Sequence, residues 1–371
     1  MIAATSGEGA SNLRGAAGAR PRYAPDAGFH AELRHRVRAY FEGNGLDDRG
    51  SAAIYVKTAI LAVWFVAAYL LLVFAADRAW QAAVLAIVLG LAVAGIGFNV
   101  QHDGSHGSYS PHRRVNGLMA IALDLLGGSS YAWRLKHNLL HHTWPNQAGV
   151  DDDIDIGWLG RLSPAQPRLR PHRWQHLYLW PLYGFLTVKW QFLDDFRFLA
   201  TGRIGGQQLA RPRGADLAVF LGGKLAFFGW AFGIPLMVHP PGVVVAVYGL
   251  AAFVAGVTLS VVFQLAHCVP EAATPSPVST WAERQVESSV DFARGSRLLA
   301  WYLGGLNFQI EHHLFPQVCH LHYPGIAPIV EGLCRSSGVR YTAYPSFGSA
   351  LRAHFLLLRQ LGRGDAAAVA E

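Results

Sequence analysis

Four long stretches of the chain are almost purely apolar. A helix that crosses the hydrocarbon core of a bilayer needs about 20 apolar residues, because each residue rises about 1.5 Å and the core is about 30 Å thick. Lys224 is the only charged residue within the stretches, and it lies close enough to one end of its span for its amine to snorkel. The pattern predicts an all-α integral membrane fold with four spans, at 58–76, 79–100, 217–238 and 242–266.

The four spans are joined in pairs, and each pair is predicted to form a hairpin. Residues 77–78 join the first two spans, and residues 239–241 join the last two. Nearly all Lys and Arg residues lie outside these joints, in the N-terminal segment, in 101–216 and after residue 266. Basic loops mark the cytoplasmic side. We therefore expect a cytoplasmic helical cap and cytoplasmic N- and C-termini, in the inner membrane if the source is bacterial.

Two further apolar segments are less simple. Residues 115–131 are short, contain Asp124 and are predicted to form a re-entrant or interfacial helix, because a fifth crossing would place residues 101 and 137 on opposite sides. Residues 172–199 mix aromatic and charged side chains, which is typical of a helix lying on the membrane surface. Disorder is predicted for residues 1–27 and 363–371, which leaves one membrane domain at 28–362.

Composition and charge agree with a membrane protein. Only 15% of the 371 residues are charged, against about 25% in soluble proteins. The net charge of +7 follows from the basic cytoplasmic segments, so nucleic acid is not expected as a partner. The three cysteines are too few and too scattered for a disulfide framework or a thiolate metal site.

The chain has 17 histidines, and most of the candidate chemistry lies in three clusters of them. On an α-helix, residues i and i+4 share a face, as His102 and His106 would. Adjacent imidazoles point about 100° apart and can therefore serve different metals. A further histidine, His267, ends the fourth span. The candidate ligands are His102, His106, His137, His141, His142, His267, His312 and His313.

Eight imidazoles fit two metal ions, because a single zinc takes about four ligands. Imidazole favours Zn, Cu, Fe or Ni, so the ligand type alone does not select iron. One histidine pair arises by chance on many helix ends, whereas three clusters and a fourth histidine on one side of the membrane do not. His320 and His322 follow the third cluster and are candidates for a supporting role. We expect structural roles for His30, His35, His112, His172, His176, His239 and His354.

The three clusters read His-Asp-x-x-His, His-x-x-x-His-His and Gln-x-x-His-His, and they resemble the boxes of the membrane fatty acid desaturases. The resemblance covers about residues 50–345. The third box begins with Gln309, the form seen in front-end and related acyl-lipid desaturases. The resemblance extends to Thr143-Trp144-Pro145-Asn146 before 151–153, to Trp281 and Gln285, and to 304–308.

This resemblance implies a di-iron centre (Fe2+/Fe3+) with O2 as co-substrate. The reaction would remove two hydrogens from neighbouring methylenes and leave a cis double bond in an acyl chain of a lipid or acyl thioester. His267 would be the ligand from outside the boxes, and Gln309 could ligate weakly, hold a water or support a ligand. Asp103 and Glu311, like Asp151, Asp152 and Asp153, could orient imidazoles, although a carboxylate-rich loop is more often solvated. An apolar substrate also implies a hydrophobic tunnel that opens to the membrane.

Many front-end desaturases carry a fused haem domain with a His-Pro-Gly-Gly turn, and this sequence departs from them because it lacks that turn. The departure implies a separate electron donor, such as a ferredoxin with its reductase. A basic surface on this chain would suit an acidic donor. Two alternatives stay open. One is a hydroxylase, ketolase or epoxidase on the same scaffold. The other is a membrane metal or haem carrier, although the histidines cluster at one face and do not line a path through the spans.

Overall fold

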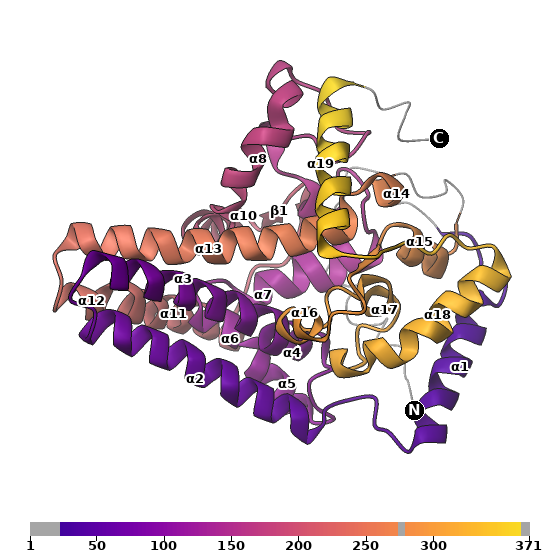
Figure 1. Cartoon of the computed structure of the whole chain (residues 1–371), viewed down its shortest axis with the longest axis horizontal. Helices are drawn as coiled ribbons and strands as arrows, with labels where there is room; N and C mark the ends of the chain where they lie inside the picture. The colour runs from indigo at the N-terminus through magenta and orange to yellow at the C-terminus, as the bar shows by residue number, and fades with distance from the viewer. Residues whose placement is uncertain (1–22, 274–278, 365–371) are drawn as a thin grey trace.

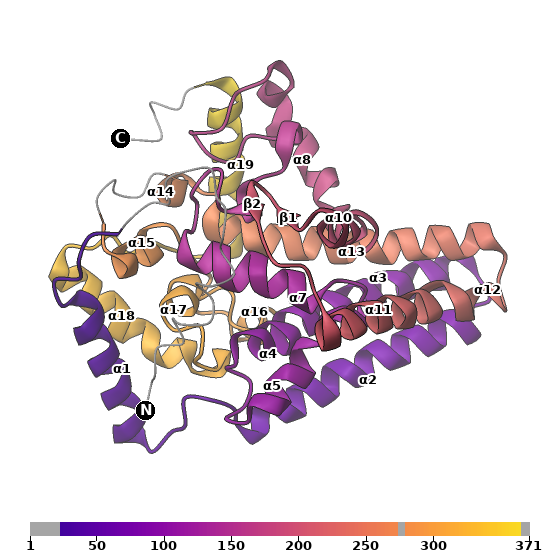
Figure 2. The ribbon, with the colours of Figure 1, turned by 180° about the vertical axis from the view of Figure 1, so that it is seen from behind.

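The computed structural model describes residues 23–273 and 279–364, and this part of the chain is mostly helical. Four helices are long and apolar enough to cross a membrane, as predicted. They run side by side on one side of the molecule, and the shorter elements form a cap at one end of them (Figures 1 and 2). The four helical stretches are Ala52–Phe74, Ala79–His106, Gly214–Leu236 and Pro241–His267.

The spans form two hairpins, and the second helix of each hairpin contacts that of the other. A Cβ atom on Gly90 would lie 2.5 Å from the Ala251 carbonyl oxygen, so only glycine permits the observed approach of the two helices. Two of the spans contain short π-helical segments. The elements are α2 (Ala52–Phe74), α3 (Ala79–Ile96), η2 (Gly97–Gln101) and α4 (His102–His106), then α11 (Gly214–Phe228), η8 (Gly229–Gly233), α12 (Ile234–Leu236) and α13 (Pro241–His267).

The cap consists of short helices and of four two-residue strands, which are the strands found in the described ranges. β1 (Arg203–Ile204) pairs antiparallel with β2 (Gln207–Gln208), and β3 (Asp291–Phe292) pairs parallel with β4 (Ala343–Tyr344). The helices before α13 are α1 (Phe29–Asn44), α5 (Arg113–Ala120), α6 (Ala122–Leu125), α7 (Ser130–Trp133), η3 (Arg134–His141), η4 (Asp152–Ile154), η5 (Gly157–Leu159), η6 (Arg170–Trp174), α8 (Gln175–Tyr183), α9 (Leu186–Lys189), η7 (Trp190–Asp194) and α10 (Asp195–Thr201). Those after it are α14 (Pro270–Ala273), α15 (Trp281–Glu287), α16 (Arg297–Tyr302), α17 (Gln309–Leu314), η9 (His320–His322), α18 (Tyr323–Ser337) and α19 (Phe347–Arg363).

Some predicted boundaries differ from the structure. The first span was expected from residue 58, but α2 begins at Ala52, because the charge that ended the apolar stretch, Lys57, is buried and lies 2.8 Å from Nε2 of His320. The predicted surface helix at 172–199 is divided into five short helical segments, from η6 to α10. Residues 115–131 form short helices, as expected for a segment that does not span.

The predicted disordered ends lie largely outside the described residues. The described part of the N-terminal segment, 23–27, is bonded to the cap. The Tyr23 hydroxyl donates to the carbonyl of Thr143, and the Ala24 N–H donates to the carbonyl of Ser279 over 3.0 Å. At the other end α19 continues to Arg363, and residues 365–371 lie outside the described ranges.

The expectation that Lys224 snorkels to the headgroups is wrong. Its side chain is buried inside the protein, where its amine lies 2.7 Å from a carboxylate oxygen of Asp195. The same amine donates to the carbonyl oxygens of Gly127 (2.6 Å) and Gln191 (3.2 Å). Lys224 therefore ties the third span to two segments of the cap.

We expect Lys224→Ala to destabilise the protein strongly. The substitution leaves the Asp195 carboxylate buried without its cation, which typically costs about 3–5 kcal/mol. Lys189→Ala is the matched control, because Lys189 forms an ion pair with Asp194 (2.6 Å) whose lysine is half exposed, and such a pair contributes at most about 1 kcal/mol. Thermal unfolding of both variants in detergent measures the difference, and equal small shifts would contradict a structural role for Lys224.

Candidate metal centre

The three predicted histidine clusters and the end of α13 meet in the structure at the junction of the spans and the cap. α4 and α17 lie close together there, beside the end of α13 (Figure 1). The eight candidate histidines come from α4, from η3 and its C-cap, from α13 and from α17. Segments that are more than 200 residues apart in the chain thus place imidazoles against one another.

The first group of imidazoles surrounds His312. One ring nitrogen from each of its four members lies within 4.8 Å of the others: His102, His106, His137 and His312. His142 joins this group, because its Nε2 atom lies 3.0 Å from Nε2 of His312. All five side chains are buried or nearly so.

The second group surrounds His313. One ring nitrogen from each of His141, His267 and His313 lies within 4.8 Å of the others. The Nε2 atom of His313 is 3.2 Å from Nε2 of His141 and 3.2 Å from Nε2 of His267. The side-chain amide of Gln309 lies at the same place, with its nitrogen 3.0 Å from Nε2 of His267. Adjacent histidines therefore face different groups, as the sequence analysis expected.

A π-helix brings the second histidine cluster together, a feature that was not predicted from the sequence. In α-helical geometry His142 would lie away from His137. Residues 134–141 instead form η3, and the N–H of His142 bonds to the carbonyl of His137. An i→i+5 bond widens the turn and returns residue i+5 to the same face. The rings of His137 and His142 consequently lie 4.9 Å apart, and those of His137 and His141 lie 5.1 Å apart.

Five of the imidazoles have their Nδ1 atom engaged by a protein group, which leaves Nε2 facing the group of histidines. Such partners fix the tautomer and the orientation of a ligating ring. Two of the five partners are carboxylates, and the other three are neutral groups. The pairs are His141 with Asp151 (2.9 Å), His137 with Asp153 (3.4 Å), His267 with the Ser288 carbonyl (3.0 Å), His312 with the Tyr323 hydroxyl (3.2 Å) and His313 with Gln285 (2.8 Å).

Burial controls the protonation of the histidines outside the spans. Desolvation, reinforced by neighbouring imidazoles, lowers the pKa of four of them well below the ordinary value, so that they are neutral and able to ligate: His137, His142, His312 and His313. Burial also disfavours the charged form of His141, but the Asp151 carboxylate outweighs it and raises the pKa of His141.

The buried ring nitrogens of the first group are placed as metal ligands would be, because several of them have no other polar partner in the part of the chain that the structure describes. Nε2 of His102, His106 and His137 is buried without a hydrogen-bond partner among the described residues. A buried polar atom left unpaired costs about 1–3 kcal/mol. Three such atoms that converge in one place would be costly, and ligation of a metal ion would satisfy them. Imidazole sets of this kind suit Zn, Cu, Fe or Ni.

The remaining candidates divide by position. Asp103 is buried and accepts from Nδ1 of His320 over 2.7 Å, while its other oxygen is 4.0 Å from Nδ1 of His102. Glu311 faces away from the histidines, and its carboxylate accepts from the Tyr341 hydroxyl (2.9 Å). His322 lies outside both groups, with its ring edge-on to Phe41 at 5.2 Å.

The carboxylate-rich loop contacts the histidines instead of being fully solvated, the state named above as the more common one for such a loop. Asp151 is buried and Asp153 is only partly exposed, and both contact histidines. Asn146, in the left-handed region at φ 57°, holds this loop to the end of α13 by donating to the carbonyl of His267 (3.0 Å). Gln285, Ser288 and Tyr323 were not assigned a role at all, because their partners are distant in sequence.

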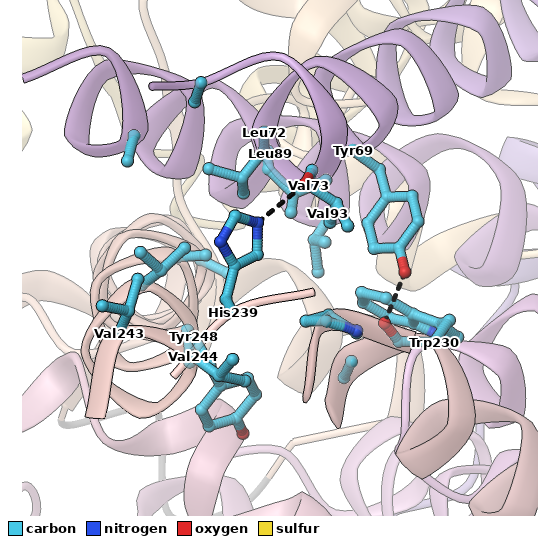
Figure 3. A pocket seen from close by; sticks show the side chains of 18 of the residues that line it. Tyr69, Leu72, Val73, Leu89, Val93, Trp230, His239, Val243, Val244 and Tyr248 are labelled. Carbon is cyan, nitrogen blue, oxygen red and sulfur yellow. Dashed lines mark hydrogen bonds between the residues drawn. The ribbon is translucent and has the colours of Figure 1, made fainter. Parts of the chain in front are cut away.

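Two neighbouring cavities, together called the channel below, lie between the first histidine group and the far end of the bundle of spans. A cavity of about 40 Å³ is lined by His102, Trp133 and Phe263. A larger cavity of about 370 Å³ adjoins it and continues between the hairpins, towards the joints at the far end. Figure 3 shows Tyr69, Trp230, His239 and Tyr248 around this larger cavity. Four residues line both cavities: Val93, Leu126, Thr187 and Gln191.

Several polar groups in the wall of the larger cavity have partners within the protein. His239 lies 2.7 Å from the carbonyl of Val73, and the Tyr69 hydroxyl donates to the carbonyl of Trp230 over 2.7 Å (Figure 3). The Tyr248 hydroxyl donates to Gln191 over 2.5 Å. His239 has the structural role that was expected for it. The channel therefore presents a mainly apolar surface to whatever enters it.

Comparison with known proteins gives consistent matches. The family model "Fatty acid desaturase" matches residues 78–345. An sn-1 linoleoyl-lipid 6-desaturase of Arthrospira platensis is 37% identical over 340 residues, which cover 90% of this chain and 92% of that protein. A protein of the same name from Synechocystis sp. is 33% identical over 93% of this chain and 99% of its own length. An acyl-lipid (8-3)-desaturase of Physcomitrium patens is 38% identical over 90% of this chain and 72% of that protein.

Proposed function

The chain belongs to the fatty acid desaturase family and desaturates fatty acyl chains, and from this premise we propose that the clustered histidines hold two irons for a reaction with O2. The observation that carries this proposal is the convergence of eight buried imidazoles into two groups beside an apolar channel. The family generally uses two irons, and the donor set fits them. The proposed ligands are His102, His106, His137, His142 and His312 in one group, and His141, His267 and His313 in the other.

Bound iron would supply the redox chemistry with O2 that breaking an unactivated carbon–hydrogen bond requires, which zinc does not offer. The protein's own groups prepare the site for it. Asp151, Gln285 and the Ser288 carbonyl hold Nδ1 of His141, His313 and His267, so that the Nε2 lone pairs point inward. Gln309 is proposed as a weak ligand or as a donor to a bound water in the second group.

The channel is proposed to hold the acyl chain. Its wall beside His102 consists of Val93, Phe263 and Trp133, which exclude water and bring a methylene close to the first histidine group. Two hydrogens leave neighbouring carbons to give a cis double bond, and O2 with two electrons and two protons becomes two waters. Two relatives that match over more than nine-tenths of their length are called sn-1 linoleoyl-lipid 6-desaturases. We therefore propose an acyl chain esterified in a membrane lipid as the substrate.

The electrons are proposed to come from a separate donor, such as a ferredoxin with its reductase. The net charge of +7 supports an acidic donor, because complementary charge speeds association. The proposed topology places both termini and the metal centre in the cytoplasm, supported by the scarcity of Lys and Arg in the two joints between paired spans. Asp103 and His320 are proposed to support the first group from behind His102.

A lipid profile tests the proposed reaction. The chain is expressed in a host that lacks polyunsaturated lipids and is fed acyl chains of graded length and unsaturation. We expect mass spectrometry of the extracted lipids to show a new product that lacks two hydrogens, with a cis double bond. A product that gains one oxygen would assign hydroxylation instead, and an unchanged profile with iron-loaded protein in the membrane would contradict the proposal.

A further inference from the structure

A cluster of arginines that form no ion pair within residues 23–273 and 279–364 lies at the tip of the cap, and it has no part in the reaction described above. α8 and α19 extend together away from α13, and Arg363 ends α19 at the tip of this projection (Figures 1 and 2). A groove of about 550 Å³ lies between the two segments at this tip. Its lining consists of Arg168, Leu169, Arg170, Arg173, Trp174 and Arg363.

The charges of this groove are not neutralised within the described residues. Arg168, Arg170, Arg173 and Arg363 are all exposed, and none of them forms an ion pair in the part of the chain that the structure describes. Arg168 instead donates to the main-chain carbonyl of Arg363 over 2.9 Å, which holds the two walls together. Four like charges gathered without a counter-ion in the described part of the chain favour an anionic ligand, and the guanidinium group suits phosphate in particular.

The position of the groove relative to the spans indicates what kind of anion reaches it. Counted from Pro241, about 20 residues of α13 cross the hydrocarbon core, so the core ends near Ser260. Ser260 donates to the carbonyl of Tyr183, the last residue of α8, over 3.2 Å. α8 therefore leaves the spans at the edge of the core and extends across their direction, as a helix in the headgroup layer would (Figure 1).

Large apolar side chains next to the arginines are exposed, which supports the same location. Leu169, Trp174 and Leu177 are 44%, 53% and 55% exposed, and the Arg173 guanidinium lies over the Trp174 ring at 5.1 Å. Tryptophan with basic residues beside apolar ones is typical of the membrane interface. An acidic electron donor is a poorer fit, because α17 with His312 and His313 lies in the middle of the cap and the groove lies at its far tip (Figure 1).

We infer that the groove between η6 and the end of α19 binds the phosphate headgroup of an anionic phospholipid and anchors the projection to the membrane surface. This site goes beyond the proposed function, because it shares no residue with the histidine groups or the channel. Each arginine near an anionic membrane surface contributes about fivefold in binding. Removing three of them is therefore expected to lower the affinity by about a hundredfold.

The test uses the purified full-length chain in neutral detergent, with native mass spectrometry of bound dioctanoyl phosphatidylglycerol or phosphatidylcholine. The variant is Arg168→Gln/Arg170→Gln/Arg173→Gln. The control is Arg38→Gln/Arg113→Gln/Arg114→Gln, which removes three exposed arginines elsewhere. We expect the wild type and the control to prefer phosphatidylglycerol and the variant to lose that preference. Arg363→Gln alone, in the opposite wall, should give a smaller loss.

Several outcomes would overturn the inference. The variant could retain the preference for phosphatidylglycerol, or the control could lose it equally, in which case total charge decides binding. Inorganic phosphate that displaces the lipid at equal concentration would show a site for free phosphate instead. A variant that binds lipid normally but needs more ferredoxin for turnover would assign the groove to the acidic donor. If the triple arginine variant loses its lipid preference but desaturates as the wild type does, the result supports this inference independently of the proposed function.

Discussion

His313→Ala is expected to abolish desaturation while the protein stays folded in the membrane. His313 is fully buried at the centre of the second group, and its Nε2 contacts Nε2 of both His141 and His267. Alanine removes the nitrogen that joins these two imidazoles and leaves the Gln285 carbonyl oxygen without its donor. The remaining pair of imidazoles cannot complete a metal site, so the bound iron should fall by about half, because the first group is left intact.

The measurements are product formation by mass spectrometry and iron per chain in the purified protein. His112→Ala is the matched control, because His112 is exposed and lies outside both groups. We expect the control to keep its activity and its iron. A His313→Ala protein that still makes product, or that retains the full iron content of the wild type, would remove His313 from the proposed ligand set.

The positions of the spans and of the histidine clusters could be predicted because both follow from local patterns in the sequence. Each span is a run of apolar residues about as long as the bilayer core requires or longer, so its position follows from sequence alone. The histidine clusters could be predicted as well, because His102 and His106 are close in sequence and the end of α13 at His267 follows from the apolar run before it. The assignment of adjacent histidines to different groups followed from the divergence of neighbouring side chains on one helix, but the placement of His142 beside His137 did not.

The features that could not be predicted depend on tertiary contacts. Lys224 was assigned to the lipid headgroups because it lies near the end of its span. In the structure its amine instead forms a buried ion pair with Asp195, which is 29 residues away in the chain. Lys57 is buried for a similar reason, beside His320. Gln285 and Tyr323 hold imidazoles through single hydrogen bonds that no short motif marks. Burial of a charge and choice of a hydrogen-bond partner are decided by packing, which spacing does not reveal.

The π-helix at η3 shows the same limit at a smaller scale. The α-helical period, on which the prediction was based, places His137 and His141 on one face and turns His142 away. The structure uses an i→i+5 bond at this point, which places His142 beside His137 in the first group while His141 faces the second. π-helical turns are rare and often occur at functional sites, so a count based on the common period is least reliable where the chemistry is located.

Val93→Phe is expected to lower desaturation of long acyl chains between about fivefold and about a hundredfold. Val93 lies on α3 and lines both cavities of the channel, where the space beside His102 is only about 40 Å³. A larger side chain at this junction overpacks the channel, and overpacking costs about 1–3 kcal/mol. A chain that must pass Val93 to bring its reacting carbons beside His102 loses that free energy on binding, whereas a chain too short to pass this point does not. The measurement is kcat/KM for a series of acyl lengths in membranes or nanodiscs.

Val84→Phe separates blockage of the channel from a general effect on the helix. Val84 is on the same helix, is 50% exposed on its outer surface and lines neither cavity. The same substitution there adds the same bulk towards lipid, so we expect unchanged kcat/KM at every chain length. Iron content should equal that of the wild type in both variants, because neither side chain contacts a histidine group. If Val93→Phe lowered the rate equally for all chain lengths, or not at all, the acyl chain would not pass through this channel, and its path would have to be sought elsewhere in the bundle.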